Sequence, residues 1–185
     1  MTARTCRSIA VRSLPLLCLL VTLGCNSSGS NSRTLHGTAT FPEQVGGGPV
    51  ANTRFVVLDL NQPGAPIVTQ GTSDANGNWS VPEAAGLTLA VIFQREDNVK
   101  RVRISGLSRP SDSGFDKPLN GQTDIACEAG VSAILQGIIS GAEMNKNLIL
   151  RLEAMTERFV DTTDYRSPAA VSNAALQVRL LVLGR

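Results

Sequence analysis

The side chains best suited to chemistry by type and spacing alternate in one polar segment: Asp74, Asn76 and Asn78. Oxygen ligands at positions one, three and five begin a calcium loop of the EF-hand type, which a bidentate Glu completes at position twelve. Position twelve is Ala85 in this chain. We therefore expect no metal site, and we interpret Asp74, Asn76 and Gly77 as a structural turn in which the glycine has a positive φ.

Two further groups of residues have types that occur in active sites. Ser132 lies in the segment Gly-Val-Ser-Ala-Ile, which lacks the second glycine of a nucleophile elbow and follows a helical pattern. Glu153 and Glu157 are one helical turn apart and could do acid–base work, but Arg151 and Arg158 beside them favour a solvated helix face. We therefore expect no catalytic residue, no enzymatic activity and no cofactor.

Histidine and cysteine usage narrows the possible chemistry further. His36 is the sole histidine, which excludes a metal site built from several histidines of one chain. Cys6 and Cys18 lie in an N-terminal segment that we expect to be removed. Cys127 lies on an apolar helical pattern, so we interpret it as a small core residue rather than a nucleophile.

The N-terminus has the order of a secretory signal peptide. Three arginines and no acid precede the apolar run 14–23, small Gly24 follows, and Cys25 stands directly after it. The apolar run is shorter than the ~20 residues that span a bilayer. The segment resembles the lipobox of bacterial lipoproteins, with Thr22 and Leu23 in reversed order, while cleavage by an ordinary signal peptidase is the alternative.

The lipoprotein resemblance implies a lipid on the Cys25 thiol, an acylated N-terminus and a membrane-anchored place in the cell envelope, on the periplasmic or cell-surface side. Two or three acyl chains anchor a protein stably, whereas one is marginal. Residues 1–24 would be the signal peptide, and residues 25–33 the lipid-anchored flexible linker. The eight residues after the cysteine have a root-mean-square span of ~16 Å.

Net charge excludes one class of partner. Removal of residues 1–24 takes three of the 17 Lys and Arg and none of the 15 acids, so 14 minus 15 leaves a formal charge of −1. Nucleic-acid binders carry clustered Lys and Arg, so we expect no nucleic-acid partner. The one basic cluster, residues 100–103, alternates like the solvated face of a strand.

Residues 34–107 have the pattern of β-strands. Trp79 should point into a core with Leu89 and Val91. Residues 87–94 alternate and predict a strand with one strongly buried face. Short strands separated by turns predict an antiparallel β-sandwich. The expected strands are 34–41, 54–60, 67–73, 78–81, 87–94 and 98–105.

Three segments of this half carry a family resemblance: Gly37, the Gly-Pro-Val-Ala-Asn of residues 48–52, and the Ser-Asp-Ala-Asn-Gly-Asn-Trp of residues 73–79. They resemble the carboxypeptidase regulatory-like, transthyretin-like β-sandwich, most of all in the hairpin. Ser73 stands in place of the family's usual Thr, and the family's later Tyr is absent. The resemblance implies an accessory, non-catalytic module over residues 34–107.

Residues 108–185 change to a helical period. Apolar positions from 125 to 142 recur every three to four residues, with Thr123 as the expected N-cap. A second helix is expected over 147–160, and Ser167 followed by Pro168 predicts the start of a third. Residues 176–183 fit either a helix or a strand. The predicted fold class is α+β, an N-terminal sandwich followed by a helical region.

These observations lead to a functional expectation. We expect a membrane-anchored envelope lipoprotein that acts as a non-catalytic interaction or assembly module with a protein partner. The alternative is a protein that binds a small ligand or glycan through loops of the sandwich, and an enzyme is the least favoured reading.

Overall fold

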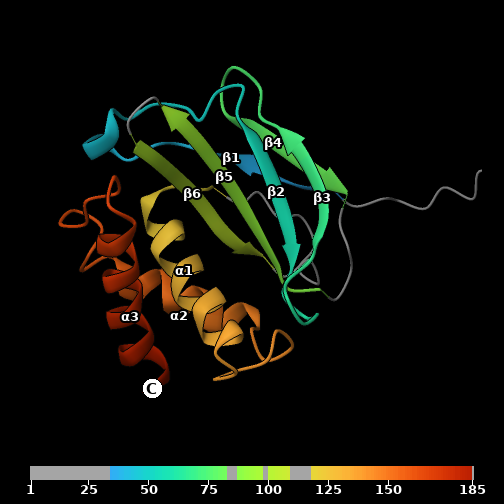
Figure 1. The fold of residues 1–185 in the computed structure, drawn as a ribbon, viewed down its shortest axis with the longest axis vertical. Helices are drawn as coiled ribbons and strands as arrows, with labels where there is room; N and C mark the ends of the chain where they lie inside the picture. Colours follow the sequence, from blue (N-terminus) through green and yellow to red (C-terminus); the bar gives the residue numbers. More distant parts are fainter. Residues whose placement is uncertain (1–33, 83–86, 98–99, 109–117, 185) are drawn as a thin grey trace, which may run out of the picture. The chain divides into compact units, whose positions relative to one another are not determined.

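The computed structural model describes residues 34–82, 87–97, 100–108 and 118–184. The signal segment, Cys25 and the linker lie outside the described residues. Residues 31–185 form a compact unit in which six strands precede three helices (Figure 1). Two antiparallel sheets and three helices confirm the predicted α+β class.

The strands form two antiparallel sheets. A two-stranded ribbon, the β1–β4 ribbon, pairs β1 (Thr34–Thr38) with β4 (Asn78–Pro82). A four-stranded sheet has the order β3-β2-β5-β6. Its strands are β2 (Arg54–Asp59), β3 (Ile67–Thr72), β5 (Leu89–Asp97) and β6 (Lys100–Ser108). A 3-10 turn, η1 (Glu43–Val45), follows β1.

The four-stranded sheet is covered on both faces. One face packs with the β1–β4 ribbon in an apolar core that includes Phe55, Val91 and Trp79. The other face, with Ala90 and Leu107, packs with the helices. The expectation of one buried face over residues 87–94 is therefore wrong, because helices cover the alternate side chains as well.

Helix α1 (Gly121–Leu135) begins two residues before Thr123, which the sequence predicted as its N-cap. Its N-cap is Asn120, whose side chain accepts a hydrogen bond from Thr123 N at 3.0 Å. Thr123 returns the bond, because its Oγ1 accepts from Asn120 N at 2.9 Å. The prediction of Thr123 as N-cap is therefore wrong, and Thr123 is the second partner of a capping box.

The remaining helices follow short connections. Gly137 has φ +67°, a left-handed conformation that ends a helix. Helix α1 therefore ends before apolar positions 138, 139 and 142, which the sequence pattern had placed in it. Helix α2 (Lys146–Thr156) is shorter than predicted. Helix α3 (Pro168–Leu183) starts at the predicted Ser167 cap, and residues 176–183 are helical. Within the described residues, no helix has the length and apolar content to cross a membrane.

Glycines allow the helical region to lie close against the sheet. A Cβ on Gly130 of α1 would stand 2.5 Å from Leu107 Cδ1 of β6. A Cβ on Gly141 would collide with the backbone carbonyl of Leu60, just after β2. Thr88 Oγ1 donates to Gly141 O at 2.7 Å across the same contact. The sheet and helices therefore share one interface rather than forming separate bodies.

Candidate functional site

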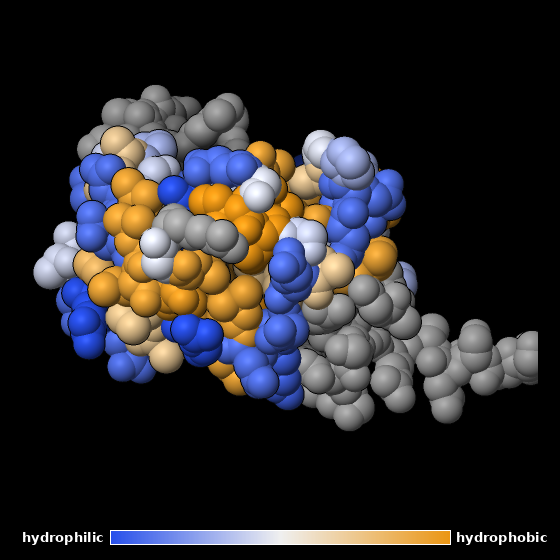
Figure 2. All heavy atoms as spheres, turned by 90° about the horizontal axis from the view of Figure 1, so that it is seen from below, coloured by the Kyte–Doolittle hydropathy of each residue, from blue (hydrophilic) through white to orange (hydrophobic). Residues whose placement is uncertain are grey.

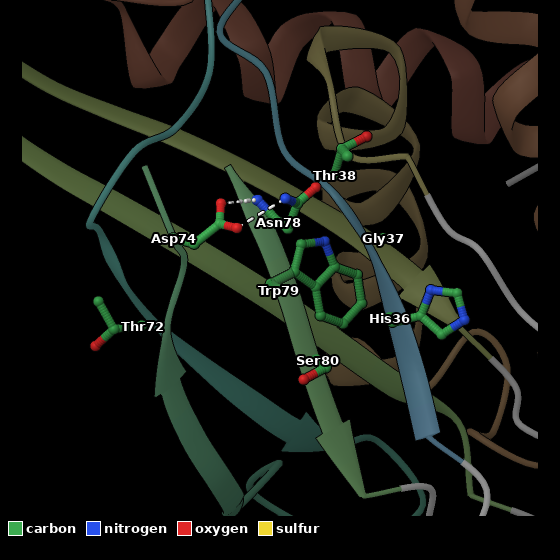
Figure 3. A pocket seen from close by; sticks show the side chains of 8 residues that line it. All are labelled: His36, Gly37, Thr38, Thr72, Asp74, Asn78, Trp79 and Ser80. Atoms are coloured by element: carbon green, nitrogen blue, oxygen red, sulfur yellow. Dashed lines mark hydrogen bonds between the residues drawn. The ribbon is translucent and has the colours of Figure 1, made fainter. Parts of the chain in front are cut away.

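A polar hollow of about 570 Å³ lies beside the connection between β3 and β4, which we call the β3–β4 turn, and is the candidate functional site (Figure 3). It is built from segments more than thirty positions apart in the chain, because β1 pairs with β4. The residues that line it are His36, Gly37, Thr38, Thr72, Asp74, Asn78, Trp79 and Ser80.

The alternation of the β1–β4 ribbon supplies the polar lining. His36 lies opposite Ser80, and Thr38 lies opposite Asn78, in the antiparallel register. All four side chains are exposed, whereas the residues between them turn toward the core. Side chains of successive strand residues point to opposite faces, so one ribbon provides both a core face and a polar face.

Asp74 holds the β3–β4 turn, which borders the hollow, through its hydrogen bonds. Its Oδ1 accepts from the backbone N–H groups of Asn76 at 2.8 Å and Asn78 at 2.9 Å. Its Oδ2 accepts from Asn78 Nδ2 at 2.7 Å, as the dashed lines in Figure 3 show. The bonds from the side chain and backbone of Asn78 hold the pKa of the Asp74 carboxyl below its usual value.

Backbone geometry at Gly77 completes the turn. Gly77 has φ +77°, and a Cβ there would stand 2.5 Å from Ala39 O and 3.2 Å from Pro49 Cβ. The predicted turn residues Asp74, Asn76 and Gly77 thus lie in the connection between β3 and β4. An L side chain at Gly77 would meet both backbone strain and steric overlap.

Ser73, at the start of the β3–β4 turn, bonds the turn to the residues before β2. It is buried, and its Oγ accepts from Thr53 N at 3.0 Å while donating to Val50 O. Its hydroxyl therefore ties the residues before β2 to the end of β3. This role needs a hydroxyl, which the Ser in place of a Thr retains.

Trp79 lines the hollow, but its side chain is almost fully buried in the core. It is 3 % exposed, and its ring contacts those of Phe55 and Phe93 at centroid distances of 6.0 and 6.4 Å. The inward direction expected for Trp79, with Leu89 and Val91, agrees with this core. Its Nε1 has no hydrogen-bond partner among the described residues. The buried ring cannot serve as a stacking platform for a ligand.

Asp59, which sequence reasoning missed, has a structural role similar to that of Asp74. Burial opposes its ionisation, but bonds from Asn61 and Gln62 outweigh that effect and hold its pKa below the usual value. Asn61 N donates to Oδ1 at 2.9 Å, and Gln62 Nε2 donates to Oδ2 at 2.8 Å. The sequence signal was an acid at the end of an apolar strand, followed after Leu60 by two amides.

The other residues considered for chemistry lie apart from the hollow. Ser132 is on α1, where its Oγ donates to Ala129 O at 3.0 Å. Cys127 is buried in the core of the helical region. Glu153 and Glu157 lie at the C-terminal end of α2, where Glu157 is exposed. Within the described part of the chain, no group of three or more His, Cys, Asp or Glu is placed to hold a metal ion.

Two buried polar residues of the helical region also escaped sequence reasoning. Tyr165 is 2 % exposed, its hydroxyl has no hydrogen-bond partner among the described residues, and burial with the charges of Asp124 and Asp161 raises its pKa. Arg179 is 8 % exposed between α1 and α3. Arg179 is the sole charged residue of α3, and this isolation in an apolar helix could have indicated a buried polar contact. No sequence feature marked Tyr165.

The lining of the hollow sets the chemistry available there. Hydroxyls, an amide and an imidazole can donate and accept hydrogen bonds. The Asp74 carboxylate already accepts hydrogen bonds within the β3–β4 turn. Such a set suits a neutral ligand rich in hydroxyl groups. Comparison of the chain with protein-family models, with curated proteins and with solved structures finds no match.

Proposed function

We propose that this chain is a membrane-anchored envelope lipoprotein whose folded part is a non-catalytic interaction or assembly module. The anchor would be the lipid on Cys25, on the periplasmic or cell-surface side of a membrane. The order of basic segment, apolar run, Gly24 and Cys25 supports the anchor. The folded part would meet a protein partner close to the membrane.

The observation that carries the interaction role is the edge of the four-stranded sheet. Among the described residues, β3 pairs only with β2, so its other side presents backbone groups to a further strand. Ile67 is 60 % exposed and Val68 is 44 % exposed on this edge strand. The strand carries no charge that would oppose pairing. An extended segment of a partner would add to β3.

Several polar side chains have structural roles, which supports a non-catalytic module. Asp59, Asp74 and Ser73 each stabilise a turn or a connection between strands through hydrogen bonds. We further propose that residues 34–107 are a transthyretin-like β-sandwich. The shared core of the β1–β4 ribbon and the four-stranded sheet, with Phe55 and Trp79 in contact, supports this assignment.

Two measurements test the anchor. Mass spectrometry of the mature protein should find Cys25 as an acylated N-terminal residue. Cys25→Ala should release the protein from membranes or stall its processing. An unmodified Cys25 in the wild-type protein would end the lipoprotein proposal.

Site-specific photocrosslinking tests the strand edge. A crosslinking residue in place of exposed Gln70 on β3 should give one discrete protein adduct in intact cells. Val68→Lys should remove that adduct, because charges on an edge strand oppose strand addition. The same crosslinker in place of exposed Glu157, the C-cap residue of α2, is the matched control. Equal adducts at both positions would contradict a specific interface on β3.

The polar hollow favours a second candidate function, the binding of a small hydroxyl-rich ligand or glycan. His36, the sole histidine, provides an NMR probe at the site. Titration with the neutral oligosaccharides cellotriose and chitotriose should shift the His36 imidazole resonances, and Ser80→Phe should block the shift. Unchanged resonances with both sugars would count against this candidate.

A further inference from the structure

A second cavity, of about 300 Å³, lies where the start of α1 meets two segments from distant parts of the chain. It is lined by residues 41–44, 120–122, 160 and 161, and we call it the acidic pocket. Glu43 and Asp161 are its charged residues, and none of its described lining residues is basic. Neither carboxylate has a hydrogen-bond or ion-pair partner in the part of the chain that the structure describes. Two unpaired negative charges at one pocket attract a cation.

Hydrogen bonds between distant segments hold the walls of the acidic pocket together. Thr40 N donates to Leu119 O at 2.8 Å, which places η1 beside the start of α1, as Figure 1 also shows. Gln44 Nε2 donates to Val160 O at 3.4 Å, which joins η1 to the connection between α2 and α3. The acidic pocket is therefore built by the tertiary fold and not by one flexible loop.

The hydroxyl of Tyr165 ends at the inner wall of the acidic pocket. Tyr165 is 2 % exposed, and its hydroxyl has no hydrogen-bond partner among the described residues. A Cβ on Gly121 would stand 2.5 Å from this oxygen and 3.0 Å from Pro42 Cγ, and both Gly121 and Pro42 line the pocket. Because residue 121 is a glycine, no side chain of that residue fills this space. Buried hydroxyls are ordinarily hydrogen-bonded, so this oxygen is a candidate acceptor for a ligand.

The electrostatic potential beside this hydroxyl is negative. Burial raises the pKa of Tyr165, and the negative charges of Asp124 and Asp161 raise it further. The start of α1 adds only about half a positive charge, and its N-cap Asn120 already accepts one of the free backbone N–H groups. The full charges of Glu43 and Asp161 outweigh that partial charge, so the acidic pocket favours a cation over an anion.

A guanidinium suits these acceptors better than a metal ion does. Calcium takes about six to eight oxygen ligands. Within the described residues, no group of three or more His, Cys, Asp or Glu is placed to hold a metal. A guanidinium has several N–H donors in one plane and no acceptor, so it can bond two carboxylates and a hydroxyl oxygen together. It is also the cation that proteins use most readily in ion pairs at interfaces.

We propose that the acidic pocket receives an arginine side chain of the protein partner, with the guanidinium between Glu43 and Asp161 and directed toward the Tyr165 hydroxyl. This inference rests on the proposed function, since it names the chemistry of one contact that the partner makes. Figure 2 views the molecule from below Figure 1, where α3 ends, and shows hydrophobic side chains gathered on that face. The acidic pocket lies at the other end of the helices, so it gives the partner a charged contact apart from that face.

An NMR titration of residues 31–185, which form a compact unit, tests the proposal. The probe is the tripeptide Gly-Arg-Gly with both ends blocked. Tyr165 is the sole tyrosine, so tyrosine labelled with ¹³C gives ring signals from this site alone. We expect the peptide to shift these signals, with an affinity that falls as salt is added. The same peptide with uncharged citrulline in place of arginine should bind about tenfold more weakly or worse.

Single charge removals test the two carboxylates. Glu43→Gln and Asp161→Asn should each weaken binding of the arginine peptide by about threefold or more. Glu143→Gln is the matched control, because it removes one exposed negative charge from the connection between α1 and α2, outside the acidic pocket. It should leave the affinity within about twofold of the wild type. Equal weakening by all three variants, or no binding by the wild type, would overturn the proposal.

Tyr165→Phe tests the hydroxyl, because it keeps the ring and removes only the oxygen. The free energy of unfolding should stay equal or rise, since the hydroxyl has no partner among the described residues. The affinity for the arginine peptide, followed on the backbone amide of Gly121, should fall by about threefold or more. An unchanged affinity would overturn the placement of the guanidinium.

Calcium chloride is the probe for the competing occupant. A calcium-induced shift that Glu43→Gln abolishes, without any binding of the arginine peptide, would assign the acidic pocket to a metal ion and overturn the proposal. The crosslinker at Gln70 on β3 tests the proposed function separately. A discrete adduct there, together with no binding of the arginine peptide, would overturn this inference and leave the proposed function standing.

Discussion

At the scale of single residues, acids and glycines hold the connections of the sheet. Asp74 and Asp59 each accept several hydrogen bonds from residues two to four positions later in the chain. Gly77 then allows the β3–β4 connection to pass close to Ala39. The stability of the β3–β4 turn therefore depends on the charge of Asp74 and on the absence of a Cβ at Gly77.

The first prediction concerns pH and Asp74. Its pKa in the folded state lies below the unfolded value of about 3.9. The ionised form is therefore the one that stabilises the fold, above pH ~4, and this stabilisation is lost as pH falls through the lower folded pKa. Asp74→Asn should reduce the free energy of unfolding at pH 7, by a difference that shrinks toward pH 3. Urea unfolding across this range measures it.

Asn76→Ala is the control for that series. The Asp74 carboxylate bonds the backbone N–H of Asn76 rather than its side chain, so the control retains the contact. Its effect on stability should not vary over the same pH range. A pH-independent difference between Asp74→Asn and the wild type would contradict the role given to the charge.

The second prediction separates backbone strain from steric overlap at Gly77 in the β3–β4 turn. Gly77→Ala should lower the free energy of unfolding by more than the ~1–2 kcal/mol that a left-handed conformation costs an L residue. The excess comes from the contact of the new Cβ with Ala39 O. Gly64→Ala is matched, because Gly64 has φ +79° with open space around its Cβ position. Equal destabilisation of both variants would rule out the overlap.

At the scale of elements, capping and close packing decide where the helices lie. Asn120 and Thr123 bond each other's backbone at the start of α1. Gly121, between them, lies where a Cβ would come 2.5 Å from the Tyr165 hydroxyl. The start of α1 is thus determined by a local capping box and by a contact with a residue far along the chain.

The third prediction tests that cap. Asn120→Ala should lower the free energy of unfolding by ~1 kcal/mol, within the usual range of about 0.5–2 kcal/mol for a lost N-cap. Asn120→Ser keeps an oxygen that can accept from Thr123 N, so it should retain most of the stability. Chemical denaturation of the three proteins measures both effects. Equal losses in the two variants would show that the amide acts through other contacts.

Local sequence patterns were enough to predict the strands, the β3–β4 turn and the start of α3. Each depends on interactions within a few residues: alternation in the strands, turn residues in the turn, and the Ser167–Pro168 cap at α3. The end of α1 was misplaced because Ile139, after Gly137, also packs against the core, as a residue on the apolar face of a longer helix would. The hollow was not predictable as a site. It needs β1 to pair with β4 instead of with its neighbour β2, which is a long-range choice.

At the scale of the whole molecule, the four-stranded sheet links two apolar cores. Its one face shares a core with the β1–β4 ribbon, and its other face shares a core with the three helices. Adjacent residues of β5, such as Ala90 and Val91, belong to different cores. Loss of either core would expose one face of the same strands.

The fourth prediction follows from this shared sheet. Residues 31–185 should unfold in one cooperative step in urea, without a stable half. Fluorescence of Trp79, the sole tryptophan, reports on the ribbon core, while circular dichroism at 222 nm reports on the helices. The two transitions should coincide. Earlier loss of the circular dichroism signal would instead identify a helical region that becomes ordered on assembly.

The β1–β4 ribbon has a mechanical consequence in a protein anchored through Cys25. Any force between the membrane and the folded part would enter at Thr34, the first residue of β1. Among the described strands, β1 pairs only with β4, but Thr40 N donates to Leu119 O and Leu119 N donates to Thr38 O. Leu119 directly precedes the cap of α1, so tension on the tether would pass into the helices as well as into β4. The ribbon would then be the part that yields first under load, and the Leu119 bridge would be its restraint.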